Sequence, residues 1–260
     1  MSDPSQAKAA NPARLSERAA FQHALQRATV AAVSPLWVPL AMGYFRFVRR
    51  YRVADMDRVR ADFDRIRSES QVPLLLCANH LTLIDSIILG WALRSAWGYV
   101  KDSDSLAWNT PERTNFAANW WHTALTYLAK CIPITRGGKR EDTGAVLNRV
   151  AHLLSRGEVA LIFPEGGRSR SGRVDAESAA WGVGRIVGAV PGCRVLCIYM
   201  RGDAQVTWSS LSAEGDRLTI ELACIEPKSD HRGARRSRDL ARQIVSKLAS
   251  MEQEYFDGRK

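Results

Sequence analysis

Residues 73–85 read PLLLCANHLTLID, and this stretch decides the fold. Its first part, residues 73–78, is an unbroken apolar run, which is typical of a strand covered on both faces. A helical pattern follows over residues 83–95, so the stretch predicts a strand that leads into a helix. The polar residues between them stand where the strand ends, and functional groups in open α/β sheets gather at such ends.

The same alternation continues along the chain. Further strands are predicted near residues 97–101, 132–136, 159–163, 194–200 and 217–225. Helices are predicted up to about residue 127, over residues 143–155, and over residues 235–256. We therefore expect an α/β fold with a mostly parallel central sheet and helices on both faces.

The N-terminal part predicts a helical arm that contacts a membrane. No charged residue stands between Arg27 and Arg46, which is about the length that a membrane-spanning helix needs. Pro35 and Pro39 interrupt this run, so a broken helical segment in the membrane interface is expected. Arginines that can reach lipid phosphates follow it: Arg46, Arg49, Arg50 and Arg52. The alternative is that these helices pack on the protein's own core.

Four segments are predicted: a polar N-terminus (1–27), the membrane-contacting arm (28–70), the α/β domain (71–226) and a C-terminal helix (227–260). The polar N-terminus has no apolar stretch after a basic start, so it does not resemble a cleaved secretory signal. The expected location is the cytoplasmic face of a membrane, with peripheral or monotopic attachment.

The composition is that of a folded, basic protein. Apolar residues make up 46% and charged residues 25% of the 260 positions, which excludes a disordered chain. Lys and Arg outnumber Asp and Glu by 37 to 27, so the surface should attract anionic lipids, nucleic acid or an acidic carrier protein. Charge alone does not choose among them.

The cysteines indicate buried, reduced thiols. There are five, an odd number, mostly within apolar runs. Cys193 and Cys197 are four residues apart, but no second Cys or His pair completes a tetrahedral zinc site. No structural metal is therefore expected.

His80 and Asp85 are the first candidate site residues. Residues five apart in a regular helix point in different directions, so the two side chains can meet only if His80 precedes the helix. One imidazole nitrogen would then donate to the carboxylate, and the other would remain free to accept a proton from a hydroxyl. The alternative is structural, because Thr82 and Asp85 have the spacing of a capping box.

Two further predicted strands end in polar turns. Residues 163–169 read FPEGGRS, in which Glu165 and Arg168 flank two glycines. Residues 132–138 read IPITRGG and place Arg136 at a similar position. Arginine beside free backbone N–H groups suits a phosphate or another polar group, although a charged turn of no further function is the alternative.

Together these blocks resemble the phospholipid and glycerol acyltransferase family, over residues 72–202. The segment from Asn79 to Asp85 is similar to its block of His, four residues and Asp. Arg136 matches the arginine of the second block, and residues 163–169 resemble the third. Val190 and Pro191, followed by a strand, resemble the fourth.

The resemblance implies a set of roles. His80 would be the general base and Asp85 would orient it, while the acceptor would be bound by Arg136, Glu165, Gly166 and Arg168. The donor would be a thioester of coenzyme A or of acyl carrier protein, with no cofactor, no metal and no nucleic acid. The partners would be an anionic membrane surface and a lipid-like acceptor.

Departures from the family pattern leave the acceptor open. Gly167 replaces the usual threonine of the third block, and residues 178–182 read SAAWG where many members that use phosphate acceptors carry a lysine before a glycine. A lysophospholipid acceptor is expected, with a non-glycerol hydroxyl as the alternative. A non-catalytic protein that binds membrane or nucleic acid is the alternative of a different class.

Overall fold

The computed structural model describes residues 15–69, 72–113, 119–135 and 137–259. Within them, six strands form one sheet in the order β1-β6-β5-β2-β4-β3. The strands are β1 (Arg52–Val53), β2 (Leu74–Ala78), β3 (Trp108–Asn109), β4 (Ala160–Ile162), β5 (Arg194–Gly202) and β6 (Arg217–Ile225). Neighbouring strands pair in parallel, apart from β5 and β6. The expected α/β fold with a mostly parallel sheet is confirmed.

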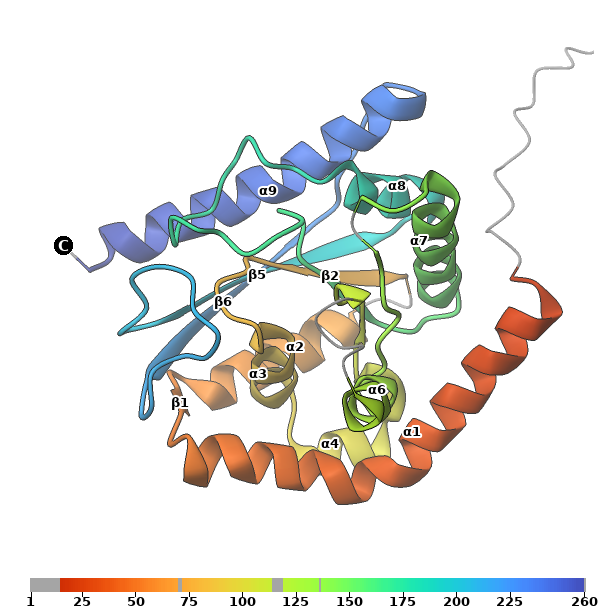
Figure 1. The fold of residues 1–260 in the computed structure, drawn as a ribbon. Coiled ribbons are helices and arrows are strands. Elements are labelled where there is room, and N and C mark those ends of the chain that lie inside the picture. The colour runs from red at the N-terminus through yellow and green to blue at the C-terminus, as the bar shows by residue number, and fades with distance from the viewer. Residues whose placement is uncertain (1–14, 70–71, 114–118, 136, 260) are drawn as a thin grey trace, which may run out of the picture.

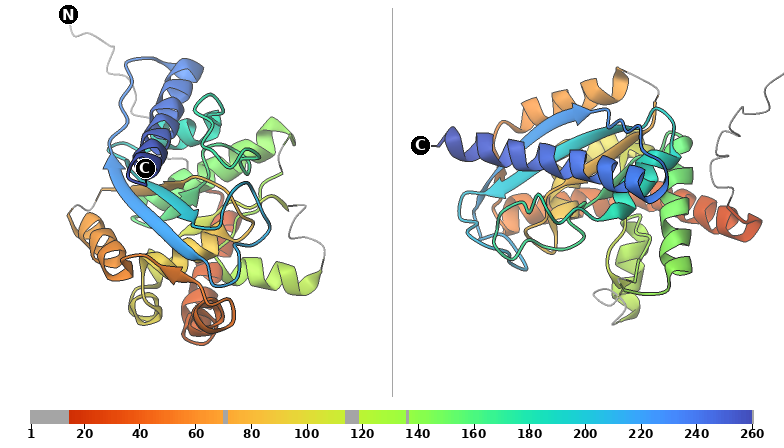
Figure 2. Two further views of the ribbon diagram at one scale, coloured as in Figure 1. Left: turned by 90° about the vertical axis from the view of Figure 1, so that its left-hand side faces the viewer. Right: turned by 90° about the horizontal axis from the view of Figure 1, so that it is seen from above.

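Helices cover both faces of this sheet. Figure 1 shows α7, α8 and α9 on one side and α2 and α3 on the other. The helical elements are α1 (Glu17–Gly43), the π-helix η1 (Tyr44–Val48), α2 (Met56–Ser68), α3 (Asp85–Leu93), α4 (Ala96–Lys101), the 3-10 helix η2 (Ser103–Ser105), α6 (Trp120–Leu128), α7 (Arg140–Ser155), α8 (Trp181–Ala189) and α9 (Gly233–Asp257). Figure 2 (left) shows α9 and α1 on opposite sides of the sheet.

The burial of β2 explains its unbroken apolar sequence. Side chains alternate between the two faces of a strand, and both faces are covered here. Leu75 and Cys77 belong to the core cluster that includes residues of α7, α8 and α9. Leu74, Leu76 and Ala78 belong to the cluster that includes residues of α2 and α3. The strand that this run forms therefore lies in the middle of the sheet, and helices cover both of its faces.

The strand predicted at residues 97–101 is wrong, because these residues form α4. The Ser95 side chain caps this helix by accepting a hydrogen bond from Gly98 N at 3.0 Å. Tyr99 is buried, and its hydroxyl donates to the Gly90 carbonyl at 2.7 Å. The edge strand is instead β3, which pairs with β4 and is too short for a period to be read from its sequence.

The strand predicted near residues 132–136 is also wrong for the described part of that segment. Only isolated parallel bridges occur there, between Cys131 and Asn109 and between Ile134 and Glu112. Pro133 has no N–H to donate, which prevents a continuous ladder. Arg136 lies outside the described residues.

The N-terminal helix differs from the broken segment that the prolines predicted. Helix α1 is continuous through Pro35 and Pro39 and runs directly into η1. Both prolines are exposed, and Figure 1 shows α1 bending along its length, so the missing donors are accommodated by a bend. The helix also begins at Glu17, before the boundary predicted at residue 28.

The two halves of α1 have different surroundings. In the first half, the buried His23 side chain lies 2.9 Å from Glu158, and Arg27 pairs with Asp104. Large apolar side chains are exposed in both halves, but most of them lie in the second half and η1: Phe21 and Leu25 in the first, and Leu36, Leu40, Tyr44, Phe47 and Val48 in the second half and η1. Among the described residues, the helical stretch Glu17–Val48 is long and apolar enough to cross a membrane, by length and composition alone. By contrast, α2, also within the predicted arm, buries Val59, Phe63 and Ile66 in the core.

Candidate active site

His80 and Asp85 meet at the carboxyl end of β2. His80 lies in the loop after the strand, and Asp85 is the first residue of α3. His80 Nδ1 is 3.0 Å from Asp85 Oδ2, so the contact that the sequence predicted is present. Because Asp85 occupies Nδ1, Nε2 is the imidazole nitrogen left to exchange a proton with a substrate.

The Asp85 carboxylate is held in place by several donors. The backbone N–H groups of Leu81 and Thr82 donate to Oδ2 at 2.7 and 2.8 Å, and the Thr82 hydroxyl donates to Oδ1. The Asp85 side chain is 1% exposed and that of His80 is 12% exposed. These bonds close the turn that begins α3, as the capping alternative predicted, and they also fix the carboxylate against the imidazole.

The exposed edge of His80 belongs to an apolar cavity. The His80 ring stacks on that of Phe163, with centroids 3.9 Å apart and planes inclined by 15°. Both rings line a cavity of about 260 Å³. Most of its wall is apolar and comes from α1, η1, α3 and the segment before β3: Val38, Met42, Phe45, Ile84, Trp91 and Leu106. A deep apolar cavity with a basic nitrogen at its wall suits a ligand with a long hydrocarbon part.

Glu165 lies in the turn after β4, and its carboxyl is only partly satisfied. Asp175 N donates to Oε2 at 3.3 Å, while Oε1 is buried with no partner among the described residues. Burial raises the pKa of Glu165 to about 7, and the backbone N–H groups of Asp175 and His80 oppose this shift. Burial therefore favours the protonated form of the Glu165 carboxyl.

Gly166 allows the tight turn that follows Glu165. Its φ of +72° is in the left-handed region that glycine adopts without strain. The turn is held from both sides, because Gly166 N donates to Phe163 O at 3.0 Å and Ala180 N donates to Pro164 O at 2.8 Å. Beyond it, Ser169 N donates to the His80 carbonyl at 2.9 Å, which ties this segment directly to the histidine.

Arg168 reaches the same cavity as His80. Its guanidinium carbon lies 4.8 Å from the centroid of the Trp208 ring, within the range of a cation–π contact. Among the residues that the structure describes, no carboxylate forms an ion pair with Arg168. The cavity therefore combines a histidine paired with a carboxylate, an apolar wall and an arginine that forms no ion pair with a carboxylate in the described part of the chain.

Comparison with known proteins agrees with this arrangement. A family model named Acyltransferase matches residues 50–201, which is more than half of the chain. The chain belongs to the acyltransferase family. A protein named "Taffazin" from Dictyostelium discoideum is 30% identical over 116 residues, which cover 45% of this chain. That match spans 39% of the length of the relative.

Of the acceptor-binding residues that the family resemblance implied, Arg168 lines the cavity wall. Glu165 and Gly166 form the turn just before it, and Glu165 is not part of the wall. Arg136 lies outside the described residues, so its role stays a prediction. The neighbouring Ile134 bridges Glu112, a cavity residue, which brings the described end of that segment close to the site.

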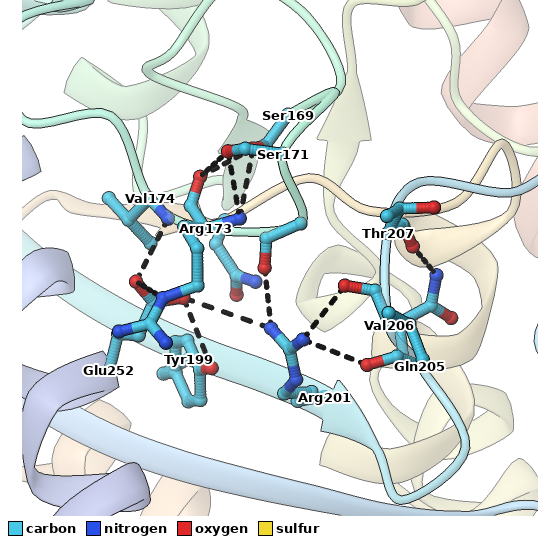
Figure 3. Close-up of polar contacts among 12 residues, drawn as sticks. Ser169, Ser171, Arg173, Val174, Tyr199, Arg201, Gln205, Val206, Thr207 and Glu252 are labelled. Atoms are coloured by element: carbon cyan, nitrogen blue, oxygen red, sulfur yellow. Dashed lines mark hydrogen bonds and ion pairs between the residues drawn. The ribbon is translucent and has the colours of Figure 1, made fainter.

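One polar cluster, which is drawn in Figure 3, was not predicted from the sequence. The buried Arg201, at the end of β5, donates to the carbonyls of Gly172 and Gln205 at 2.5 and 2.8 Å. Glu252 of α9 accepts from Arg173 Nε and from Val174 N, each at 3.0 Å. The cluster fixes the segment that follows Arg168. The sequence contains two signals of this cluster. Arg201 stands at the end of a predicted strand, and Glu252 lies on the apolar side of a predicted helix.

Two further expectations concern the cysteines and metal binding. All five cysteines are free, and three of them are buried: Cys77, Cys193 and Cys197. Burial raises the pKa of Cys193 and of Cys197 to about 12, which keeps these thiols protonated and unreactive. Within the described ranges, no group of three or more His, Cys, Asp or Glu side chains is placed to hold a metal ion. The absence of a metal stays a prediction.

Proposed function

We propose that this chain is an O-acyltransferase that moves a fatty acyl group from a thioester to a hydroxyl of a lysophospholipid or a similar lipid-like acceptor. The observation that carries this proposal is the His80–Asp85 pair at the wall of an apolar cavity that Arg168 also lines. Membership of the acyltransferase family supports it. A non-catalytic protein would need neither the fixed pair nor the cavity beside it.

The chemistry follows from the free nitrogen of His80. In the proposed reaction Nε2 takes the proton of the acceptor hydroxyl, and the oxygen attacks the thioester carbonyl. The tetrahedral intermediate then collapses, the carbon–sulfur bond breaks, and the imidazolium returns the proton to the leaving thiolate. Asp85 stabilises the imidazolium and holds the ring in the required tautomer. No nucleophilic serine or cysteine of the protein is needed.

The substrates are assigned by the chemistry of the cavity. Its apolar wall suits a fatty acyl chain, and Arg168 suits an anionic or strongly polar head group. We assign Glu165, Gly166 and Arg136 to the same acceptor subsite. The donor is a thioester of coenzyme A or acyl carrier protein, both of which are anionic and match the net charge of +10. No metal or further cofactor takes part.

A membrane supplies the acceptor in this proposal. The exposed apolar side chains of α1 and η1 would insert in the interface, and Arg46, Arg50 and Arg52 would face anionic head groups. Val38 and Met42 of the same helix line the cavity, so the inserted surface and the cavity adjoin. We place the protein on the cytoplasmic face, attached peripherally or monotopically.

A non-glycerol hydroxyl is the second candidate acceptor, and one observation favours it. The segment of residues 175–180 packs on the Glu165–Gly166 turn through Ala180, where many family members that use phosphate acceptors carry a lysine nearby. This chain offers no lysine in that segment, so fewer cations face the acceptor.

The decisive experiment measures acyl transfer with the full chain on vesicles that contain anionic phospholipid. Coenzyme A and carrier-protein thioesters are each offered with a lysophospholipid, a monoacylglycerol and a long-chain alcohol, and the products are identified by mass spectrometry. Transfer to the lysophospholipid that disappears in His80→Ala supports the proposal. Transfer only to the alcohol favours the second acceptor. Hydrolysis without transfer to any of these acceptors contradicts both.

A further inference from the structure

The contact between Arg168 and Trp208 has a feature that an ion pair lacks. A tryptophan ring attracts the guanidinium through its π face and takes none of its N–H donors. A carboxylate would neutralise the charge and occupy the same donors that a substrate needs. Trp208 therefore restrains Arg168 while leaving its charge and its donors available to the cavity.

Trp208 belongs to the loop between β5 and β6, and this loop is fixed to the His80 segment. Ser209 N donates to Leu81 O at 3.0 Å, and Leu83 N donates to Ser210 O at 3.2 Å. These bonds lie on either side of the parallel bridge between Ser209 and Thr82. The Thr82 hydroxyl in turn donates a hydrogen bond to Asp85. The tryptophan thus stands directly before a backbone link to the segment that carries the general base.

The same loop is also fixed to the segment that carries Arg168. Figure 3 shows Arg201 reaching toward Gln205 and Val206, and its third acceptor is the Gly172 carbonyl. Gly172 packs so closely that a Cβ there would collide with the Val206 carbonyl oxygen. The Arg168 segment and the Trp208 loop are therefore held together at a fixed separation.

We propose that Trp208 is a positioning residue that aims the Arg168 guanidinium at an anionic head group of the acceptor. This inference rests on the proposed role of Arg168 in acceptor binding. With the ring in place, the guanidinium fork faces the cavity while the acceptor hydroxyl meets His80 Nε2. Without the ring, Arg168 keeps its charge but samples several rotamers, so binding of the head group weakens.

The test compares substitutions of Trp208 in the full chain on vesicles. Trp208→Ala should raise the acceptor KM by about twofold to tenfold, the range of a partly exposed cation–π contact, and leave the donor KM unchanged. Trp208→Leu keeps apolar bulk without a π face and should behave like Ala, whereas Trp208→Phe should recover most of the affinity. Leu211→Ala is the matched control, because Leu211 lies in the same loop and is 43% exposed against 44% for Trp208.

A double substitution shows whether Trp208 acts through Arg168. In an Arg168→Ala background, Trp208→Ala should change the acceptor KM by less than about twofold, because the group that it positions is gone. Equal effects of Trp208→Ala in both backgrounds would overturn the inference. So would a Trp208→Leu enzyme with the acceptor KM of the wild type.

The acceptor's charge provides the second readout. The acceptor KM for a lysophospholipid with a phosphate monoester should respond to Trp208→Leu, and that for an uncharged monoacylglycerol should not. If Arg168→Ala itself leaves the acceptor KM unchanged, the assignment of Arg168 to the acceptor fails, and the role of Trp208 fails with it. If only Trp208→Leu is without effect, the assignment of Arg168 stands and this inference alone is wrong.

Discussion

The segment after β2 and the segment after β4 both end at the same cavity, but they are held in different ways. His80, Thr82 and Asp85 bond to one another within six residues, and the pair is almost fully buried. The segment with Glu165 and Arg168 depends on Arg201, Trp208 and Glu252, which lie far away along the chain. Glu165 Oε1 has no partner within the described residues. In the proposed function, the first segment performs the chemistry and the second receives a ligand.

The largest expected effect tests the first segment. His80→Ala should lower the turnover number by about 10²-fold to 10⁴-fold, since a general base contributes that much to proton transfer. The substitution leaves the Arg168 subsite intact, so the acceptor KM should change little. Steady-state kinetics on vesicles measures both. His122→Ala is the control, because His122 also lines the cavity. Normal turnover by a folded His80→Ala protein would contradict the mechanism.

The next effect tests the second segment. Arg168→Ala should raise the acceptor KM by about tenfold to a hundredfold, because a charge-assisted hydrogen bond is worth about 1.5–3 kcal/mol. Turnover should fall less than in His80→Ala. Arg170→Ala serves as the control, since Arg170 is an exposed arginine two residues away. A raised donor KM with an unchanged acceptor KM would mean that the second segment binds the thioester instead.

A third expectation concerns α1, which supplies part of the wall for both segments. Replacing Leu40 and Phe47 with Ser should weaken binding to anionic vesicles by about tenfold, because each loses part of the free energy of burying an apolar side chain. Vesicle sedimentation measures this. Replacing Phe21 and Leu25, also exposed but in the first half of α1, is the matched comparison. Equal losses for the two pairs would refute a membrane surface confined to the second half.

The last effect leaves binding and turnover aside and concerns the pH dependence of stability. Burial raises the pKa of Glu165 from 4.5 to about 7, so the folded protein keeps a proton there that the unfolded chain loses. The contribution of the protonated Glu165 carboxyl to the free energy of unfolding is fully present below about pH 4.5 and is lost as the pH rises through 7. Glu165→Gln should therefore gain about 2–3 kcal/mol of stability relative to the wild type between pH 5 and pH 8.

Thermal unfolding of both proteins at the two pH values measures this gain. Glu177→Gln is the control, because Glu177 is an exposed carboxylate in the same part of the chain. An equal difference between Glu165→Gln and the wild type at pH 5 and pH 8 would mean that folding does not shift the pKa of the Glu165 carboxyl.

Much of the fold was predictable because it follows local periods. The run of residues 73–78 and the helical patterns near α3, α7 and α9 correspond to elements that form as expected. The errors at residues 97–101 and 132–136 have local causes as well. Ser95 caps a helix that an apolar run concealed, and Pro133 prevents a ladder where a strand pattern was present. The bend of α1 shows that a proline in a solvent-facing position need not end a helix.

The sequence by itself determined the His80–Asp85 pair, because its partners are five residues apart and a strand end followed by a helix start brings them together. Only the tertiary structure decided the cavity wall and the acceptor side. Trp208 lies over Arg168, Glu252 holds Val174, and His23 of α1 meets Glu158, and each pair joins elements that are distant along the chain. Such contacts have no period in the sequence. The contacts of Arg168 and Val174 form because the sheet order places the carboxyl ends of β2, β4 and β5 side by side, whereas Glu158 precedes β4 and meets α1 at the other end of that strand.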